Sequence, residues 1–145
     1  MHLGRTTLSK FLIQQLEGIE GSRDLGALLI DVAAAVKTIS SMAAKGALGG
    51  YLGKAGTENV QGEQQQKLDV IANEILLRTL GGRQGVAIVA SEENEEPVIL
   101  RNEREGERSY CVLFDPLDGS SNLDVCGSVG TIFSILRQDR RAARA

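Results

Sequence analysis

The chain has 145 residues, a hydrophobic fraction of 42% and a formal net charge of −3, values that suit one domain with an aliphatic core. The chain has no basic field to attract a phosphate backbone, and no apolar stretch reaches the roughly 20 residues of a membrane span, so we expect neither a nucleic-acid nor a membrane partner. Two isolated cysteines and the lack of a signal-peptide pattern predict a cytoplasmic location.

Apolar residues at helical spacing predict two amphipathic helices near the N-terminus. The first runs from about Leu8 to Ile19, with Thr6 or Thr7 as its cap, and the second from Leu25 to Ile39. Five glycines between residues 46 and 56 then predict a flexible connection or lid, and a phosphate loop is improbable there because no strand precedes it.

A third helix is expected over about Val60–Leu80. Beyond it the chain reads as a series of short strands, separated by a charged turn at Arg101–Arg108. The strands are Val86–Ala90, Val98–Leu100, Tyr110–Phe114 and Val129–Leu136. Because the helices and strands are segregated along the chain, we predict an α+β layered fold with the N-terminal helices packed on a mixed sheet. We expect the domain to span residues 1–136, followed by a disordered or aberrant tail at 137–145.

The segment FDPLDGSSN, residues 114–122, carries the strongest chemical signal. We expect Pro116 to end the preceding strand, because proline cannot continue a sheet ladder. Asp115 and Asp118 would then stand at the end of a rigid element as oxygen ligands for a hard cation. The turn that follows, with Gly119 and two serines, offers backbone N–H groups and hydroxyls to a phosphate.

Two further acidic clusters could join these aspartates. Glu92 and Glu93 follow the strand Val86–Ala90, while Glu63 and Asp69 lie in the expected third helix. If the strands ending at Ala90 and Phe114 are parallel neighbours, their carboxyl ends meet. Such crowding of like charges needs Mg²⁺ or Mn²⁺. Each cluster also has a simpler interpretation, because acidic runs are commonly solvated surfaces and aspartate favours turns and helix starts.

Three ordered blocks resemble class 1 fructose-1,6-bisphosphatase. They are FDPLDGSSN with SVGTIFSI (128–135), NVQGEQQQKLDVIANE (59–74) and ASEENE (90–95), and the likeness runs from about Leu8 to Ile135. The resemblance implies a layered sugar-phosphatase fold and an enzyme that hydrolyses the 1-phosphate of fructose 1,6-bisphosphate. That activity depends on magnesium, and it belongs to gluconeogenesis or the Calvin cycle. The family's enzymes form tetramers, so a homo-oligomer is expected.

The resemblance also implies roles for individual residues. Metal ligands would be Glu92, Glu93, Asp115, the carbonyl of Leu117, and Asp118. The 1-phosphate would contact Asp118, Gly119, Ser120 and Ser121. The catalytic carboxylates that help activate water would be Asp69 and Glu93, and Glu63 stands where many relatives have aspartate.

The chain departs from the family in length and at the AMP site. Family members are more than twice as long, so we expect a truncated form that lacks the second half of the fold. Ser22, Asp24 and Tyr110 are candidate AMP contacts, although the threonine-rich turn of AMP-inhibited relatives is absent. The alternatives are a non-catalytic AMP-binding or oligomerisation module, a sedoheptulose-1,7-bisphosphatase, and a partly folded fragment without a function of its own.

Overall fold

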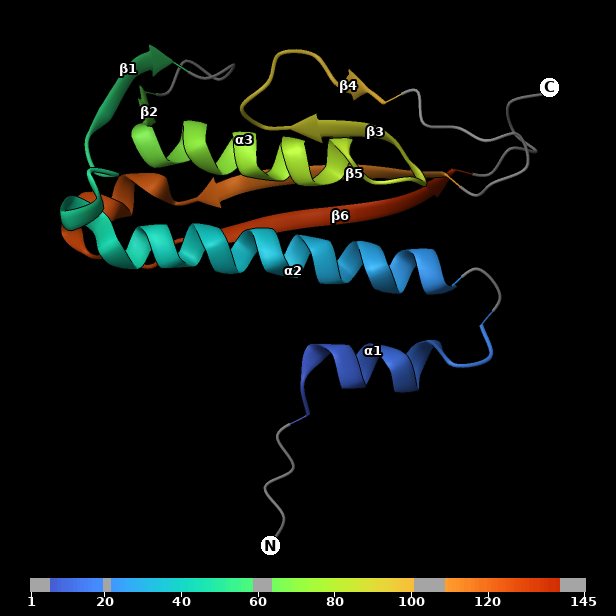
Figure 1. The fold of residues 1–145 in the computed structure, drawn as a ribbon. Helices are drawn as coiled ribbons and strands as arrows, with labels where there is room; N and C mark the ends of the chain where they lie inside the picture. The colour runs from blue at the N-terminus through green and yellow to red at the C-terminus, as the bar shows by residue number, and fades with distance from the viewer. Residues whose placement is uncertain (1–5, 20–21, 59–63, 101–108, 139–145) are drawn as a thin grey trace, which may run out of the picture.

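The computed structural model describes residues 6–19, 22–58, 64–100 and 109–138 (Figure 1). In chain order its elements are α1 (Leu8–Leu16), α2 (Ser22–Lys45), the short 3-10 helix η1 (Gly46–Gly49), β1 (Lys54–Glu58), β2 (Gln64–Gln66), α3 (Lys67–Gly81), β3 (Val86–Ser91), β4 (Val98–Ile99), β5 (Ser109–Asp118), the 3-10 helix η2 (Ser120–Val125) and β6 (Gly130–Gln138). The α+β fold predicted from the sequence is confirmed.

The first two helices form where the apolar periodicity placed them. Thr7 caps α1 by accepting a hydrogen bond from the backbone N–H of Lys10 at 3.2 Å. The hydroxyl of Ser22, at the start of α2, donates to the carbonyl of Leu16 at 2.8 Å and ties the two helices together. Helix α2 extends to Lys45 and is longer than its apolar pattern predicted.

Helix α2 differs from the expectation that no segment is long and apolar enough to span a membrane. By length and composition alone, this 24-residue helix is apolar enough to cross a membrane, and it is the one such helix within the described ranges. A core helix of a soluble protein passes the same test. Leu28, Val32 and Ile39 are almost fully buried in the core, but only 22% of the apolar window is buried, so packing within the described residues accounts for part of the apolar character of α2.

The chain between α2 and α3 differs from the prediction. The glycine-rich segment contains η1 and β1, and β1 pairs with β2 in an antiparallel ladder, so this segment is not simply a connecting loop. Helix α3 begins at Lys67 rather than near Val60. The carboxylate of Asp69 accepts a hydrogen bond from the backbone N–H of Gln66 at 2.6 Å, which fixes the first turn of the helix at this point.

The main sheet has the strand order β4-β3-β5-β6. Strands β3 and β5 are parallel, with Ser91 opposite Phe114, whereas the outer two pairings are antiparallel. The expectation that Pro116 ends the strand is wrong, because β5 continues to Asp118. Its ladder with β6 is irregular between Asp115 and Asp118, and proline is tolerated at such a bulge because no ladder N–H is required of it.

One face of the sheet is covered by helices. Figure 1 shows α3 lying across β3 and β5 with α2 beside it, and their apolar residues join those of the strands in one core. On β5 the buried Val112 and Phe114 alternate with Leu113, which is 39% exposed. Ile132 and Leu136 share the face of Leu113 through the β5–β6 register and are more than half exposed.

Strand β6 carries the chain two residues beyond the predicted domain boundary. Arg137 and Gln138 pair with Tyr110 and Ser109, so they belong to the sheet. The rest of the expected tail, at 139–145, lies outside the described residues, as does the predicted charged turn at 101–108.

Candidate active site

Asp69 is a buried carboxylate at the start of α3. Its side chain is only 2% exposed, and one of its oxygens accepts the hydrogen bond from Gln66. The other oxygen, Oδ1, is buried without a hydrogen-bond partner. A buried acceptor is normally satisfied, so this bare oxygen marks the corner as more than a helix cap.

The surroundings of Asp69 raise its pKa above the ordinary value of 3.8. The largest cause is burial, which disfavours the charged form, and the nearby charge of Asp115 adds to the increase. Hydrogen bonds from the Gln66 backbone and from the Ser120 side chain act in the opposite direction. Asp69 on α3 is thus within electrostatic range of Asp115 on β5 and of Ser120 at the start of η2.

Glu92 and Glu93 lie in the turn that follows β3, where the parallel pairing brings the turn to β5. The backbone N–H of Glu92 donates to the carbonyl of Phe114 at 3.0 Å, so Glu92 lies next to the residue preceding Asp115. The N–H of Glu93 donates to the hydroxyl of Ser91 at 3.2 Å. Strands β3 and β5 are parallel neighbours, so the condition on which the meeting of their carboxyl ends depended is met.

The bulge at the end of β5 is held by two local hydrogen bonds. Oδ1 of Asp115 accepts from the N–H of Leu117 at 2.9 Å, and the hydroxyl of Thr131 donates to the carbonyl of Pro116 at 2.9 Å. Asp115 is half-buried and Asp118 is exposed. The segment that precedes the phosphate turn is thus fixed to β6 on one side and presents one aspartate to solvent.

Gly119 begins the predicted phosphate turn in a left-handed conformation, with φ +74°. Its carbonyl accepts from the N–H of Asn122 at 2.8 Å, and the Asn122 side chain donates to the carbonyl of Ser128 at 3.0 Å. A Cβ on Gly119 would approach Asn122 to 3.2 Å. The turn is therefore tight, and it leaves Ser120 half-buried and Ser121 exposed.

The structure brings together part of the predicted metal site. Asp69, Asp115 and the turn bearing Glu92 come from three segments that meet at one edge of the sheet. All their side-chain donors are oxygens, and the bare Oδ1 of Asp69 is available, so the chemistry suits a hard divalent cation. However, no group of three or more His, Cys, Asp or Glu side chains in the described part of the chain is arranged to hold a metal ion. Glu63 lies outside the described residues.

The sequence reasoning missed several polar residues that support the site. Gln66 supplies the backbone N–H that holds Asp69, and Thr131 holds the bulge of β5 from the neighbouring strand. Asn73, one helical turn after Asp69, hydrogen-bonds to Ser91 and Asn94. The spacing of Asp69 and Asn73 on one helix face was the available signal, since residues four apart are neighbours on a helix.

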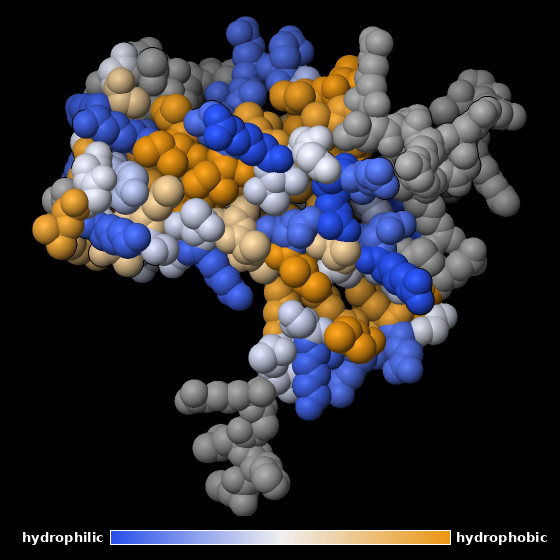
Figure 2. Space-filling model, in the orientation of Figure 1, coloured by the Kyte–Doolittle hydropathy of each residue, from blue (hydrophilic) through white to orange (hydrophobic). Residues whose placement is uncertain are grey.

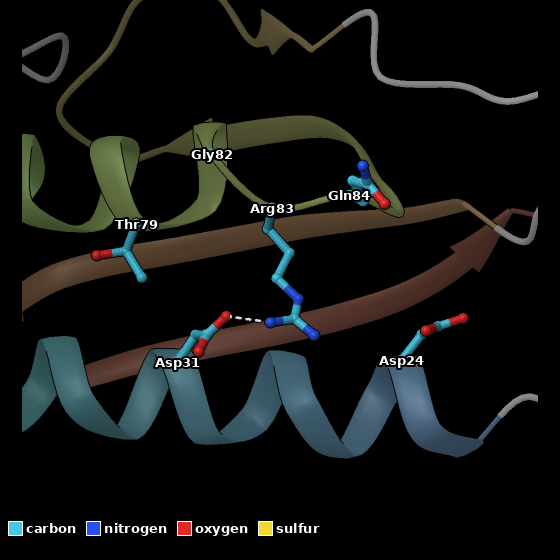
Figure 3. Close-up of a pocket in the computed structure, with 6 residues that line it drawn as sticks. All are labelled: Asp24, Asp31, Thr79, Gly82, Arg83 and Gln84. Atoms are coloured by element: carbon cyan, nitrogen blue, oxygen red, sulfur yellow. Dashed lines mark hydrogen bonds and ion pairs between the residues drawn. The ribbon is translucent and has the colours of Figure 1, made fainter.

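Of the candidate AMP residues, Asp24 lines a pocket of the described structure. Figure 3 shows an open pocket of about 450 Å³ between α2 and the end of α3, which includes Asp24. Ser22 and Tyr110 are not among its lining residues. Arg83 points across this pocket and forms an ion pair with Asp31. Two carboxylates and one paired guanidinium do not favour a phosphate, so AMP binding stays a prediction.

Comparisons with known proteins identify the family of this chain. The family model described as "Fructose-1-6-bisphosphatase, N-terminal domain" matches residues 6–144. The crystal structure of Leishmania major fructose-1,6-bisphosphatase in holo form is similar, with a TM-score of 0.81 and 34% sequence identity over 93% of this chain and 40% of that one. The apo form of that enzyme has a TM-score of 0.69 and 31% sequence identity over 93% of this chain and 37% of that one. The T-state form has a TM-score of 0.70 and 30% sequence identity over 93% of this chain and 38% of that one. This chain thus spans about 40% of the length of these structures, and it belongs to the fructose-1,6-bisphosphatase family, within the N-terminal domain.

Proposed function

We propose that this chain is the part of a sugar bisphosphatase that binds the divalent cation and the 1-phosphate of fructose 1,6-bisphosphate. The complete enzyme would hydrolyse that ester to fructose 6-phosphate and phosphate. One observation carries the proposal: Asp69 lies close enough to Asp115 and Ser120 to interact with both. A buried acid on α3 thereby meets the aspartate and serine motif that follows β5.

Oxygen ligands for Mg²⁺, or Mn²⁺ in its place, would come from the ends of two neighbouring strands. A bound cation would lower the pKa of a coordinated water and neutralise charge on the phosphate. The ligands would be Glu92, Glu93, Asp115, Asp118 and the carbonyl of Leu117. Glu92 and Asp115 are supported most directly, because a backbone hydrogen bond holds their segments together.

Asp69 is the group proposed to accept a proton from the attacking water. Burial raises its pKa, so protonation costs less free energy here than at an exposed aspartate. The N–H groups of the turn at Gly119, with the hydroxyls of Ser120 and Ser121, would hold the phosphate. The Ser120 hydroxyl lies near enough to Asp69 to lower the pKa of that carboxylate, and because it has one proton we infer that it turns away from Asp69 when it donates to a phosphate.

A chimeric enzyme tests the activity. Residues 6–144 of this chain would replace the matching segment of the Leishmania major enzyme, and phosphate release from fructose 1,6-bisphosphate would be measured with Mg²⁺. We expect turnover that falls about 100-fold in Asp118→Asn. The control is Glu74→Gln, an exposed acid on α3, which should leave turnover unchanged. A folded chimera without activity, or equal rates in the two variants, would refute the proposal. Competition with sedoheptulose 1,7-bisphosphate would show which sugar is preferred.

Exposed apolar residues on α1 favour a second proposal, that this helix contacts another copy of the chain. Phe11 is 50% and Ile13 71% exposed, and Figure 2 shows apolar side chains gathered on α1. Large exposed apolar patches commonly mark interaction sites. Sedimentation velocity would show a multimer that dissociates in Ile13→Ser but not in Thr38→Ser, a change at an exposed position of α2. A wild-type monomer at all concentrations would exclude this role.

A further inference from the structure

One side chain on α3 is hydrogen-bonded to both ends of the turn that carries Glu92 and Glu93. The amide oxygen of Asn73 accepts from the Ser91 hydroxyl at 2.8 Å, and its amide nitrogen donates to Oδ1 of Asn94 at 2.7 Å. Ser91 is the last residue of β3 and is buried, while Asn94 lies three residues further on. The two bonds therefore span the turn from one end to the other.

The donors and acceptors of this network have a single direction. The N–H of Glu93 donates to Oγ of Ser91, whose one proton is donated to Asn73, whose NH₂ in turn donates to Asn94. In this arrangement the Ser91 hydroxyl gives its one proton to Asn73 and accepts from Glu93, so both of its roles are used within the network. The network also contains a backbone N–H of the turn, so it constrains the main chain and not only the side chains.

The position of Asn73 relates the turn to the rest of the site. Asn73 follows Asp69 by four residues, and such residues are neighbours on a helix surface. The backbone bond from Glu92 to Phe114 fixes the turn to β5, and the bonds of Asn73 fix it to α3. The turn is thus tied separately to both elements that supply the other carboxylates.

We propose that Asn73 is a positioning residue, which holds the turn bearing Glu92 and Glu93 against α3 so that these carboxylates face the same cation as Asp69 and Asp115. This inference rests on the proposed function for the role of the carboxylates. Asn73 touches neither substrate nor cation in this account. It acts in the way that outer hydrogen-bond partners orient metal ligands, whose loss typically weakens metal binding by about 10–100-fold.

The test combines two measurements on the wild-type chain and on Asn73→Leu, which keeps the side-chain size and removes both hydrogen bonds. Amide hydrogen exchange, measured without metal, should become at least about 10-fold faster at Glu92, Glu93 and Asn94, because the turn opens more readily. Mn²⁺ affinity, measured by electron paramagnetic resonance titration, should fall about 10–100-fold. Thr38→Val is the control, because it removes one side-chain hydrogen bond from α2, and it should change neither quantity.

The possible outcomes separate this inference from the proposed function. Unchanged exchange at the turn in Asn73→Leu overturns the inference, and so does faster exchange with unchanged Mn²⁺ affinity. If the wild-type chain binds no Mn²⁺, the proposed function fails for this chain and the positioning role of Asn73 fails with it. If the wild-type chain binds Mn²⁺ but amide exchange is unchanged in Asn73→Leu, only the positioning role is refuted. Should Asn73→Leu fail to fold, Asn94→Ala replaces it. This change at a half-exposed residue removes the hydrogen bond between Asn73 and Asn94, and the same exchange and affinity measurements apply.

Discussion

Replacing Asp69 by asparagine is expected to stabilise the domain at neutral pH although it removes the proposed proton acceptor. The carboxylate is 2% exposed, its Oδ1 has no hydrogen-bond partner, and burial raises its pKa. The folded state therefore carries a charge that would be more stable in water. Functional sites commonly hold such unfavourable groups, so substitutions that relieve them gain stability and lose activity.

The magnitude follows from the two oxygens of Asp69. An unsatisfied buried acceptor costs roughly 1–3 kcal/mol, and asparagine removes the charge that makes this oxygen costly. The asparagine oxygen can still accept from the N–H of Gln66, so the helix start is kept. The new amide protons need an acceptor, so we expect a net gain of about 1 kcal/mol in the free energy of unfolding. Asp69→Ala loses the capping bond as well and should cost about 1 kcal/mol.

The gain should depend on pH in a defined direction. Because the folded-state pKa of Asp69 is raised above 3.8, protonation favours the folded state. The stability that the protonated Asp69 contributes is fully present below pH 3.8 and is lost as the pH rises through the higher pKa of the folded state. The advantage of Asp69→Asn should therefore be largest near pH 7 and shrink as the pH falls toward 4.

Urea unfolding followed by circular dichroism, at pH 7 and pH 4, measures these differences. A gain of about 1 kcal/mol corresponds to a rise in Tm of roughly 4 °C for a domain of this size. If Asp69→Asn is as unstable as Asp69→Ala at pH 7, the buried charge does not destabilise the domain. The same follows if the difference between Asp69→Asn and the wild type is equal at both pH values.

Three further changes test the packing around the site. Gly119→Ala should lower the free energy of unfolding in urea by about 1–2 kcal/mol because of its positive φ. The loss should exceed that of Gly50→Ala, which has a similar φ of +72° but open space around it. Equal losses would show that crowding at Gly119 has no effect. Thr131→Val should lose about 1 kcal/mol by removing the bond to the Pro116 carbonyl, and an unchanged midpoint would show that this bond is not needed. Arg83→Ala should cost less than about 1 kcal/mol, and less still in 1 M salt, because its ion pair is partly exposed; a larger, salt-independent loss would refute this.

The sequence predicted the part of the site that depends on strand ends. Apolar runs ending in acids placed Glu92 and Asp115 at the same edge of a sheet, and the parallel pairing of β3 and β5 confirms it. The start of α3 was not predictable from periodicity. Gln64–Gln66 suits a helix by composition, but the chain there pairs with β1, and Asp69 fixes the first turn of the helix at Lys67.

Tertiary contacts decided the remaining features. Pro116 reads as a strand terminator, but a bulge against β6 removes the need for its missing N–H, so β5 continues. The roles of Gln66 and Asn73 depend on which elements pack against α3. The four-residue spacing places Asn73 on the helix face of Asp69 but does not reveal its partners. Spacing alone likewise did not reveal that Asp24 shares a pocket with Arg83.

The parallel pairing of β3 and β5 has a kinetic consequence. Parallel strands need a long connection, and the loop must close before their contacts contribute, which slows folding. The acids at the two strand ends approach one another only in that step, so their mutual repulsion opposes the closure. Added salt or a divalent cation should accelerate refolding of this chain by screening the approach, and stopped-flow refolding at varied ionic strength would detect it.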